Sequence, residues 1–559
     1  MKNYHDLLIH NIDIFSLALN ENKTRRGRQS SEEQVGYGVN KLRHLVLDLA
    51  IKGRISEQFE SDEPSCQLIQ RILLKKGEVL LRQKLKTDCN VASKGADVPF
   101  ELPRSWVWAT LGDIGWTQTG STPPKNDPSM FGSEIPFIKP ADIYKTHVNY
   151  SNEGLSIEGA KTSSRIAKAG SLLMVCIGTI GKCNLIERDC SFNQQINSLT
   201  PCLMNPDYLL LALRSNYFQK SAWAKSSSTT IPILNKGKWE KILIPIPPLD
   251  EQQRIADRVD ELMSLFDRLE ALISNASQSH DFLVAAYINQ LLKSENLEIF
   301  ENNWISVLEV FDKLFTSEQS IDLLQEVLYQ LAVTGKLSTQ NSSDRSVFNL
   351  LNSKTSDQGC EEALPNNWIV ATLDEFALKI TDGEHFRPPT EDSGVYFLSA
   401  KDIRDEGVSL DNPLYISAET ADKALKRCNP EYGDVLIVSR GATVGRTCIV
   451  NIHDVFCLLG SVILVKPGRV LGDYLVLALK SPAIKEKLIN ASGSTAQPAI
   501  YLKDLKKIIF TIPPLEEQKR IIEKMKELNN FCDQLKFQIS QGGHLKRRLA
   551  DALVEQALA

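Results

Sequence analysis

The feature that most constrains this chain is an internal repeat. Four short sequence blocks occur twice, in the same order along the chain. The pairs are LDLAIKGRIS (47–56) with YQLAVTGKLS (329–338); LPRSWVWATL (102–111) with LPNNWIVATL (364–373); AGSLLMVCIGTIGK (169–182) with YGDVLIVSRGATVGR (432–446); and DYLLLALRS (207–215) and IPIPPLDEQQRI (244–255) with DYLVLALKS (473–481) and FTIPPLEEQKRI (510–521). Collinear repeats of this kind indicate that one structural unit occurs twice.

Each unit is expected to contain a short helix, a globular head, a Pro-Pro pair and then a long helix. The heads mix short β-rich runs such as VILVKP with helical stretches such as DYLLLALRSNYFQKSA, so the predicted fold class is α+β, or mixed α/β. The expected segments are an N-terminal lead-in with a polar linker (1–40), an N-terminal helical region (41–99), the first head (100–246), a central helical region (247–361), the second head (362–512) and a C-terminal helix (513–559).

The long helices carry a narrow apolar stripe. Both start after a Pro-Pro pair, have acidic residues in the first turn, and repeat apolar residues in alternating steps of four and three. The coiled-coil positions are Ile255, Val259, Leu262, Phe266, Leu269 and Ile273 in the first helix, and Ile521, Met525, Leu528, Cys532, Leu535 and Ile539 in the second. We expect the two helices to pair antiparallel, which gives a pseudo-twofold repeat. The alternative is that each helix packs separately on its own head.

This pairing predicts the dimensions and the closure of the fold. A helix from Leu249 to about Asn275 is roughly 40 Å long, close to one DNA turn of about 34–36 Å. The short helix 323–337 can pack where the chain passes between the heads. Its copy at 41–55 must instead meet the C-terminal helix 515–556, so the two ends of the chain are expected to associate. Residues 1–40 find no repeat partner, and 21–34 is interpreted as a polar linker.

Composition narrows the functional classes. The 559 residues are 42% hydrophobic and 24% charged, which is typical of a globular protein. No apolar run is long enough to span a membrane, and the N-terminus lacks the pattern of a secretory signal, so a cytoplasmic location is expected. The net charge of -5 argues mildly against DNA binding by the isolated chain, but not against a local basic face. Eleven cysteines without a C-x-x-C pair predict reduced, mostly buried thiols and no metal site.

The sequence lacks the motifs of a catalyst. NPDY (205–208), NPLY (412–415) and NPEY (429–432) miss the second proline of an adenine-methyltransferase loop and are expected to form turns. GTIGK (178–182) is too short for a P-loop and predicts a hairpin-like turn. The acid pair Asp402 and Asp405 is expected to be solvated. An enzyme of unrecognised type that uses a head cleft remains the alternative from another class.

Together these motifs resemble the specificity subunits of type I restriction–modification systems. The resemblance rests on I-P-[IL]-P-P-L-x-E-Q-x-R-I, found approximately in both copies, on L-A-[IV]-x-G-[KR]-[IL]-S, on the Leu-Pro-x-x-Trp strand that opens each head, and on the GTIGK and ATVGR turns. It covers residues 41 to 559.

The resemblance implies two target recognition domains that each read one half of a bipartite, asymmetric double-stranded DNA site. It implies that the helices set the spacing and dock two modification (methyltransferase) subunits, and that restriction (translocase and nuclease) subunits join the complex. The chain itself would have no active site, cofactor or metal, because S-adenosylmethionine, ATP and Mg²⁺ would belong to the partner subunits. A two-headed nucleic-acid or protein scaffold in another defence complex is the alternative.

Reading DNA requires polar side chains on loops that occupy matching places in both heads. GSTPPK (120–125), after the first strand, and SSSTTIP (226–232), before the last strand, match DGEHFRPP (382–389) and SGSTAQP (492–498). The candidate DNA-binding residues are Ser121, Thr122, Lys125, Lys139, Ser227, Thr229 and Thr230 in the first head, and His385, Arg387, Lys401, Arg440, Ser494, Thr495 and Gln497 in the second.

Three of these candidates have a more specific interpretation. Lys139 and Lys401 lie beside a strand end at nearly matching positions, where they could reach phosphate or guanine. Arg440 could donate two hydrogen bonds to a guanine, whereas the first head has Ile177 in the same neighbourhood. The two half-sites are therefore expected to differ in sequence.

Overall fold

The computed structural model describes most of the chain. The described residues are 10–18, 36–82, 98–124, 126–163, 165–227, 231–294, 297–341, 343–344, 364–365, 367–491 and 498–558. The chain divides into unit 1, Met1–Asn275 with Gly543–Ala559, and unit 2, Ala276–Gly542. Two long helices, α9 (Leu249–Leu292) and α18 (Leu515–Leu558), contribute to both units. Unit 1 therefore contains the start of α9 and the end of α18, whereas unit 2 contains the start of α18 and the end of α9.

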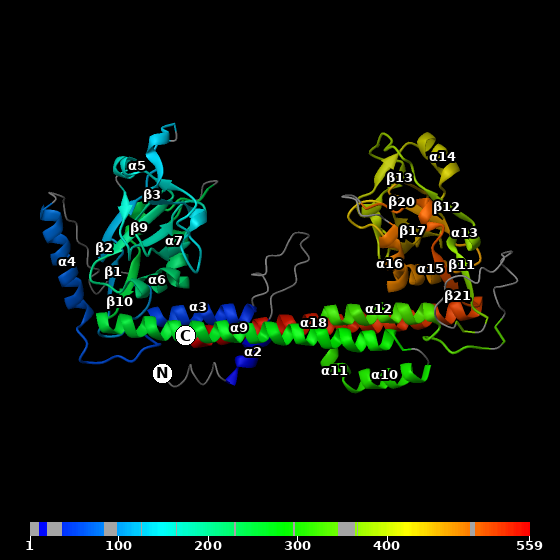
Figure 1. The fold of residues 1–559 in the computed structure, drawn as a ribbon, viewed down its shortest axis with the longest axis horizontal. Helices are drawn as coiled ribbons and strands as arrows, with labels where there is room; N and C mark the ends of the chain where they lie inside the picture. The colour runs from blue at the N-terminus through cyan, green and yellow to red at the C-terminus, as the bar shows by residue number, and fades with distance from the viewer. Residues whose placement is uncertain are drawn as a thin grey trace. The chain divides into compact units, whose positions relative to one another are not determined.

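Head 1 is built from three sheets (Figure 1). Its first and last strands, β1 (Val107–Thr110) and β10 (Leu243–Ile246), form an antiparallel pair. The second sheet has the order β2 (Gly115–Thr119), β9 (Ile196–Pro201), β6 (Leu172–Val175), β7 (Cys183–Leu185). The third has the order β4 (Gly154–Leu155), β3 (Phe131–Ile138), β8 (Cys190–Phe192), β5 (Ile166–Ala167), with β3 and β8 parallel.

Head 2 repeats this plan with small differences. The pair β11 (Ile369–Thr372) and β21 (Ile509–Ile512) corresponds to β1 and β10. The second sheet has the order β12 (Lys379–Asp382), β20 (Val462–Lys466), β17 (Val435–Val438), β18 (Thr447–Ile449). The third has the order β16 (Leu414–Ile416), β13 (Val395–Leu398), β19 (Phe456–Leu458), again with a parallel pair, β13 and β19. A short hairpin of β14 (Ile403–Arg404) and β15 (Gly407–Val408) completes the head.

Helices connect and support these sheets. In unit 1 they are α2 (Ile12–Leu17), α3 (Tyr37–Ile51), α4 (Ser65–Arg82), α5 (Ile157–Ser163), α6 (Pro206–Arg214), α7 (Asn216–Ala224) and α8 (Lys236–Glu240), with the short 3-10 turns η2 (Pro128–Met130) and η3 (Pro140–Asp142). In unit 2 they are α10 (Leu297–Glu309), α11 (Phe311–Leu314), α12 (Glu318–Thr334), α13 (Leu373–Phe376), α14 (Ala418–Arg427), α15 (Gly472–Lys480), α16 (Pro482–Ala491) and α17 (Leu502–Leu505), with η5 (Ala400–Asp402). The predicted mixed α/β class is confirmed.

One hydrogen-bonded junction joins head 1 to its long helix. The indole Nε1 of Trp106 donates to Glu251 Oε2 at 2.8 Å, and Ser56 Oγ donates to Glu251 Oε1 at 2.9 Å. Glu251 is fully buried, and burial raises the pKa of its carboxyl group. The backbone of Gly53 lies so close to Pro103 that a Cβ on this residue would be 2.5 Å from Pro103 Cγ. The φ of +65° at Gly53 also favours glycine. The repeated Gly-[KR]-[IL]-Ser, Leu-Pro-x-x-Trp and Pro-Pro-Leu-x-Glu blocks therefore meet at one place.

Unit 2 has the same junction. Trp368 Nε1 donates to Glu517 Oε2 at 2.9 Å, and Ser338 Oγ donates to Glu517 Oε1 at 2.8 Å. A Cβ on Gly335, whose φ is +72°, would lie 2.3 Å from Pro365 Cγ. The repeated motifs are thus explained by the packing of each head on its helix.

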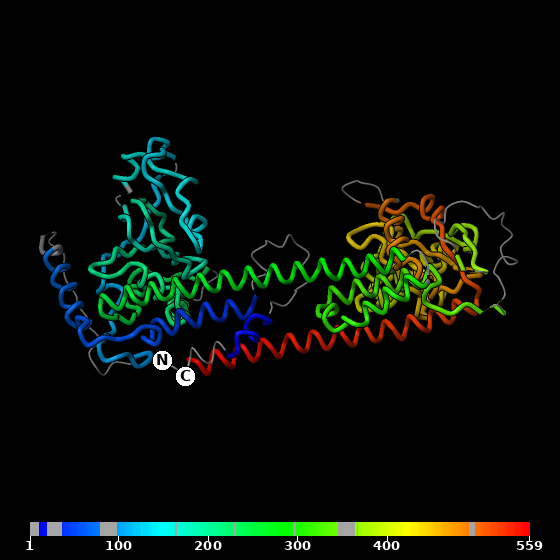
Figure 2. Tube along the Cα trace, turned by 60° about the horizontal axis from the view of Figure 1, so that its bottom comes forward, coloured from blue at the N-terminus to red at the C-terminus, as the bar shows by residue number. Residues whose placement is uncertain are grey.

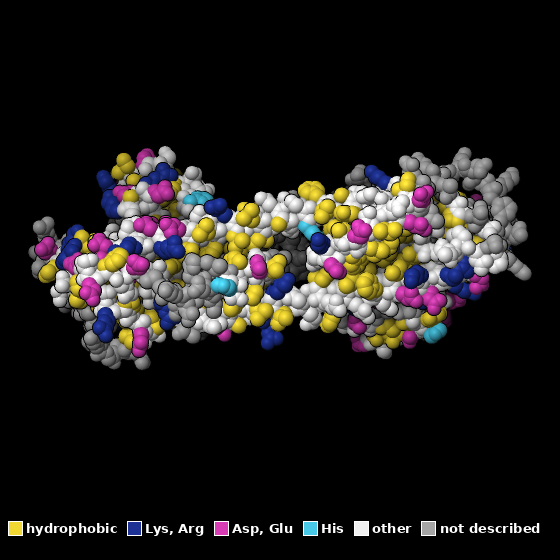
Figure 3. Space-filling model, turned by 90° about the horizontal axis from the view of Figure 1, so that it is seen from below, with side chains coloured by type: hydrophobic (Ala, Val, Ile, Leu, Met, Phe, Trp, Pro, Cys, Tyr) yellow, Lys and Arg dark blue, Asp and Glu magenta, His cyan; other side chains and the backbone are white. Residues whose placement is uncertain are grey.

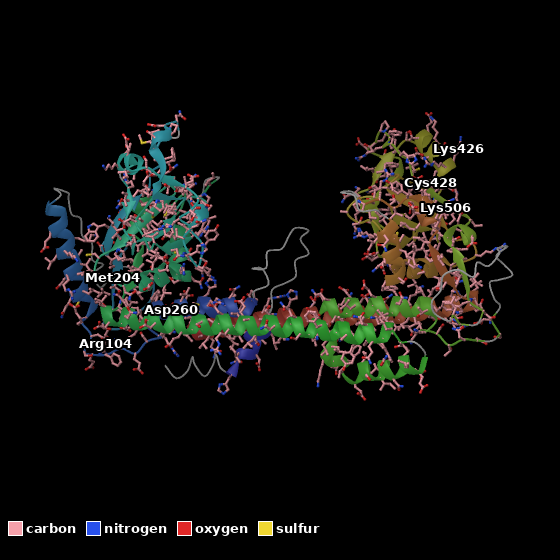
Figure 4. All side chains as sticks on the ribbon, viewed as in Figure 1. Arg104, Met204, Asp260, Lys426, Cys428 and Lys506 are labelled. Carbon is pink, nitrogen blue, oxygen red and sulfur yellow. The ribbon has the colours of Figure 1, made fainter. Side chains whose placement is uncertain are left out.

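The glutamine of each Pro-Pro-helix block adds a second set of bonds. Gln252 Nε2 donates to the carbonyl of Pro247 at 2.9 Å, and its Oε1 accepts from Asn205 N at 2.9 Å, beside Met204 at the start of α9 (Figure 4). In unit 2, Gln518 makes the equivalent bonds to Pro513 and Leu471. The side chain thereby satisfies backbone groups at the beginning of the long helix.

The apolar stripes of the long helices do not face each other as predicted. Residues 255–273 of α9 pack in the core of unit 1 with α3, the head and Ala550, Leu553 and Val554 of α18. Residues 521–539 of α18 pack in the core of unit 2 with α12, the head and Val284, Ile288 and Leu291 of α9. In each unit the start of one long helix packs on the end of the other, so the predicted antiparallel pairing is confirmed. The two stripes do not meet each other, because α9 continues through the polar stretch 274–281, whose side chains are mostly exposed. Each stripe therefore meets both its own head and the far end of the other long helix.

The predicted association of the chain ends is confirmed within unit 1. Helix α3 lies beside the last turns of α18 (Figure 2), where Lys41 Nζ pairs with Asp551 Oδ1 at 2.7 Å and Tyr37 donates to the same carboxylate at 2.9 Å. Near the other end of α3, Lys52 Nζ donates to the carbonyl of Leu558 at 3.0 Å. Leu45, Leu49 and Ala557 form a small buried cluster between these contacts. The helix α3 starts at Tyr37, a few residues before the predicted boundary.

A short stretch of the N-terminal segment, for which the sequence predicted no repeat partner, has a local backbone similar to that of 309–315. His10 is helical and is followed by one turn residue and the short helix α2, and Glu309 is likewise followed by one turn residue and α11. Asn11 precedes α2 with φ −118° and ψ 16°, and Val310 precedes α11 with φ −117° and ψ 13°. The sequence similarity of the two segments is weak, because they share little more than an acidic residue, Asp13 or Asp312, in the short helix.

Candidate nucleic-acid interface

Three segments of head 1 meet beside the sheet β2-β9-β6-β7. The loop after β2 bonds to the chain around β8 and β9, because Gly120 N donates to Ile196 O at 3.0 Å and Ser121 N donates to Phe192 O at 3.1 Å. The end of β6 joins them, because Cys176 N donates to Gln195 O at 2.8 Å and Ile177 forms a β-bridge with Ile233. We call 120–124, 176–177, 193–195, 227 and 231–233 the loop cluster of head 1.

Head 2 builds the same arrangement from the equivalent residues. Gly383 N donates to Val462 O at 3.2 Å, Glu384 N donates to Leu458 O at 2.8 Å, and Ser439 N donates to Ser461 O at 2.9 Å. Arg440 forms a β-bridge with Ala499, as Ile177 does with Ile233. We call 383–387, 439–440, 459–461 and 498–499 the loop cluster of head 2.

A glycine at the start of the loop after β2 or β12, which we call the reading loop after its predicted role, allows this close approach. A Cβ on Gly120 would lie 2.1 Å from Asn193 O, and a Cβ on Gly383 would lie 2.1 Å from Leu458 O. No other residue type fits such a distance without moving the backbone. The backbone of the two clusters is therefore the same, whereas their side chains differ.

The structure places several candidates of head 1 in its loop cluster. Thr122 Oγ1 donates to Gln194 Oε1, Ser121 is half-buried, and Ser227 bonds through its backbone to Ile233 O at 2.9 Å. The loop with Ser121 and Thr122 follows the second strand of the head rather than the first, and residues 226–232 precede α8 rather than the last strand. Lys125, Thr229 and Thr230 lie outside the described residues.

The structure places three candidates of head 2 in its loop cluster. His385, Arg387 and Arg440 belong to the loop cluster, and Arg440 is exposed at the position that Ile177 occupies in head 1. Ser494, Thr495 and Gln497 lie outside the described residues.

Lys139 and Lys401, predicted at nearly matching positions, are not equivalent residues. Lys139 precedes η3 and Ser399 precedes η5, so these two residues are equivalent. Asp142 and Asp402 explain the similarity of the segments: each is buried and accepts a hydrogen bond of 2.8 Å from the backbone N of residue 139 or 399. Asp402 is therefore a structural cap and not a solvated acid.

Both lysines have partners outside the loop clusters. Lys139 forms an ion pair with Glu153, and Lys401 Nζ donates to the carbonyl of Asn412 at 2.9 Å.

The GTIGK and ATVGR segments form the predicted turns. They connect β6 to β7 and β17 to β18, and their glycines have positive φ values. Lys182 Nζ donates to the carbonyl of Pro140, the first residue of η3, at 2.8 Å, and Arg446 Nη1 donates to the carbonyl of Ile403, just after η5, at 3.4 Å. These basic residues are structural within each head.

The NP segments are only partly the predicted turns. Asn205 caps α6 and Pro206 opens this helix, Leu414 and Tyr415 belong to β16, and only 429–432 form a connection before β17.

Comparison with known proteins identifies the family of this arrangement. The family described as "Type I restriction modification DNA specificity domain" matches residues 103–276 and 365–542. The chain belongs to this family. Each match begins within the Leu-Pro-x-x-Trp motif and ends inside a long helix, so it contains one head and the tryptophan and glutamate of its junction.

The chain is also similar to two curated specificity subunits and to one solved chain. The specificity subunit of the type I restriction enzyme EcoAI from Escherichia coli is 29% identical over 602 aligned positions, which cover 99% of both chains. The EcoEI specificity subunit from Escherichia coli is 26% identical over 612 positions, with the same coverage. A solved chain from work on complex assembly and conformational transition of the type I R-M system is 20% identical, with a TM-score of 0.49, and covers 82% of this chain and 99% of its own.

As a specificity subunit, the protein is a DNA-recognition component without its own catalytic activity. The described residues contain no group of three or more His, Cys, Asp or Glu side chains placed to hold a metal ion. Every described cysteine is free and all but Cys66 are buried, as predicted, and burial raises the pKa of Cys176 and Cys448 to about 12. No helix in the described part is long and apolar enough to cross a membrane.

An arginine holds the start of the reading loop in each head of the specificity subunit. Arg165 Nη1 donates to Thr119 O at 2.6 Å, and Arg427 forms an ion pair with Asp382 at the equivalent strand end. Figure 4 labels Lys426 and Cys428, the neighbours of Arg427 in the chain, in the upper part of head 2. Arg165 follows α5 and Arg427 is the last residue of α14, so the same support recurs although the sequences of these helices differ.

One segment of the interface was missed in the sequence. The turn Asn193, Gln194, Gln195 lies between β8 and β9 in the centre of the loop cluster, and Gln194 is exposed. Its counterpart is Leu459, Gly460, Ser461, which shares no residue with it. Only the polar composition of the turn could have signalled a function.

Proposed function

We propose that each head reads one half of a bipartite, asymmetric site on double-stranded DNA. The observation that supports this is the contrast between the two loop clusters: the same backbone hydrogen bonds carry different side chains. Ile177 in head 1 corresponds to Arg440 in head 2, and Gln194 corresponds to Gly460. Two scaffolds that differ only in the side chains they present would read two different sequences. The target recognition domains would comprise residues 100–246 and 362–512.

Equivalent exposed hydrophobic residues support docking of two modification subunits. In unit 1, Leu265 on α9 and Leu549 on α18 are 51% and 43% exposed; in unit 2, their repeat counterparts Phe531 on α18 and Leu283 on α9 are 47% and 50% exposed. Further hydrophobic side chains gather on the face of unit 2 that Figure 3 shows from below. Exposed apolar groups at matching places typically mark a surface that binds a partner, and two such surfaces suit two copies of one partner.

The partners would supply the chemistry. In this proposal the long helices set the distance between the half-sites, and the modification subunits bring S-adenosylmethionine for adenine methylation. The restriction subunits bring the ATP- and Mg²⁺-dependent translocase and nuclease. The complex would act on DNA in the cytoplasm, where the reduced state of the buried cysteines is expected.

Arg440 offers a direct test of recognition by head 2. Arg440→Ala is expected to relax the base preference at one position of one half-site, because an arginine that bonds to a guanine contributes about 1–3 kcal/mol of discrimination. The measurement is methylome sequencing of cells that express the variant with its modification subunit. Arg469→Ala is the matched control, because Arg469 is exposed at the opposite end of β20 in the same head. A uniform loss of affinity for all sequences would instead assign Arg440 to a phosphate.

The docking proposal predicts a change in stoichiometry. Leu265→Lys and Phe531→Lys should each reduce the number of bound modification subunits from two to one, since each removes apolar contact area from one surface only. Native mass spectrometry of the purified complex measures this number. Leu74→Lys, at an exposed leucine of α4, is the control. Retention of two subunits by both variants would contradict this placement of the docking surfaces.

The general proposal is tested by deleting the gene. The cell should lose one bipartite methylation motif from its genome, and expression of the chain in trans should restore it. Persistence of every motif would contradict the proposed function, as would DNA methylation by the isolated chain with S-adenosylmethionine.

A further inference from the structure

Gln194 has the placement of a side chain that reads a base in head 1. The turn that carries it is fixed from within: Gln195 N donates to Asn193 Oδ1 at 3.1 Å, and Asn193 Nδ2 donates to Gln195 Oε1 at 3.0 Å. Asn193 is buried, whereas Gln194 is exposed at the tip of the turn. The turn therefore presents one flexible polar side chain on a rigid support.

Thr122 from the neighbouring loop orients this side chain. Its hydroxyl donates to Gln194 Oε1, which leaves the second lone pair of this oxygen and both Nε2 hydrogens for another molecule. An acceptor and a donor side by side match the N6 amino group and the N7 atom that adenine presents in the major groove. The hydroxyl thus prepares the glutamine for a two-bond contact with an adenine edge.

In head 2 the large polar side chain comes from the loop after β12 and not from the turn that corresponds to 193–195. Gly460 occupies the place of Gln194, and a Cβ there would lie 3.0 Å from the carbonyl oxygen of Glu384 and 3.4 Å from His385 Nδ1, so the loop leaves little space for a side chain at this position. His385 occupies the place of Thr122 and is half exposed. The polar side chain comes from the central turn in head 1 and from the reading loop in head 2.

Two residues of head 2, Arg427 and Asp382, orient the imidazole ring of His385. Arg427 Nη2 lies 2.9 Å from His385 Nε2, and Asp382 Oδ2 lies 3.8 Å from Nδ1. Since a guanidinium can only donate, Nε2 accepts and the ring proton is placed on Nδ1. Each head therefore fixes one polar side chain at the same place by a different set of bonds.

We propose that Gln194 determines one base of the half-site read by head 1, with adenine as the preferred base, and that His385 acts at the equivalent place in head 2. This inference rests on the proposed function, because it assumes that the loop clusters face DNA. Thr122 and Arg427 act as positioning residues.

The test uses the complete complex with its modification and restriction subunits. Methylome sequencing of wild type and variants reads the preferred base at every position of both half-sites. Gln194→Ala is expected to lower discrimination at one position of one half-site by on the order of 10-fold or more, without change in the other half. His385→Ala should alter a position in the opposite half-site.

A second substitution distinguishes base reading from a structural role. Gln194→Glu replaces the donor with an acceptor, and a carboxylate accepts from the N4 amino group of cytosine, so the preferred base should shift toward cytosine. Gln70→Ala, at an exposed glutamine of α4, is the control for a general effect of substitution.

The outcomes separate the inference from the proposed function. Unchanged half-sites in both Gln194 variants, or equal weakening at all sequences, would overturn the role of Gln194. Absence of any bipartite motif that depends on the wild-type chain would instead overturn the proposed function.

Discussion

Ala550→Asp is expected to destabilise unit 1 by about 3–5 kcal/mol, because it places an unpaired charge in the core. Ala550 is 0% exposed and packs in the cluster that joins α3, the first part of α9 and head 1. A domain has a total stability of only about 5–15 kcal/mol. The variant should therefore expose much of unit 1 to solvent at moderate temperature.

Hydrogen–deuterium exchange with mass spectrometry measures the protection of backbone amides in unit 1 and in unit 2 separately. The amides of α3 should lose protection in Ala550→Asp, whereas those of β17 and β20 in unit 2 should keep it. Ala552→Asp is the matched control, because Ala552 is exposed two residues further along the same helix. Equal protection in the two variants would mean that the end of α18 does not stabilise unit 1.

The second large effect is expected at the junction of head 1. Glu251→Ala leaves the indole of Trp106 and the hydroxyl of Ser56 without their acceptor, and each buried unsatisfied group costs about 1–3 kcal/mol. We expect a loss of about 2–5 kcal/mol in the unfolding free energy of unit 1, measured by chemical denaturation. Asp250→Ala removes an exposed acid one residue earlier and should cost only about 0.3–1 kcal/mol through the helix dipole.

The same carboxyl group predicts a pH dependence. Because burial raises the pKa of Glu251, the folded chain holds this proton more tightly than the unfolded chain does. Stability should therefore fall as the pH rises from the ordinary carboxyl value through the raised one. Glu251→Gln keeps an acceptor for Trp106 but cannot ionise, so its denaturation free energy should lack this part of the fall. A difference between wild type and Glu251→Gln that does not vary with pH would contradict the assignment.

The two heads and their junctions with the long helices could be predicted from the sequence, because the repeated motifs make the same contacts in both units. Trp106, Ser56 and Glu251 belong to three repeated blocks, and the structure shows that they bond to one another. The equivalence of Arg440 and Ile177 was also visible, because the glycine turns that follow fix their positions. The contact of α3 with the end of α18 could be predicted because α3 is the repeat copy of α12, and α18 offers the only repeated long helix that remains to pair with it.

The remaining features left no pattern to detect. The polar run 274–281 suggests the end of a helix, yet α9 continues because those side chains only need to face water. Gln194 was missed because its turn has no sequence in common with the turn of Gly460. Lys139 and Lys401 lie at nearly matching positions in the aligned segments, but the residue that the two segments share is the buried aspartate that caps the turn. A contact made by different residue types in the two units leaves no repeated pattern in the sequence, so it could not be predicted.

The repeated junction has an evolutionary consequence. Both heads offer the same donors to the helix, an indole from the opening strand and the backbone amide before α6 or α15, and both long helices offer the same glutamate and glutamine acceptors. A recombination event with crossovers near the opening tryptophan and near the Pro-Pro pair would exchange a whole head and leave these bonds intact. Genes that code for such chains can thus acquire a new half-site in one step, whereas point changes in the loops alter one base at a time.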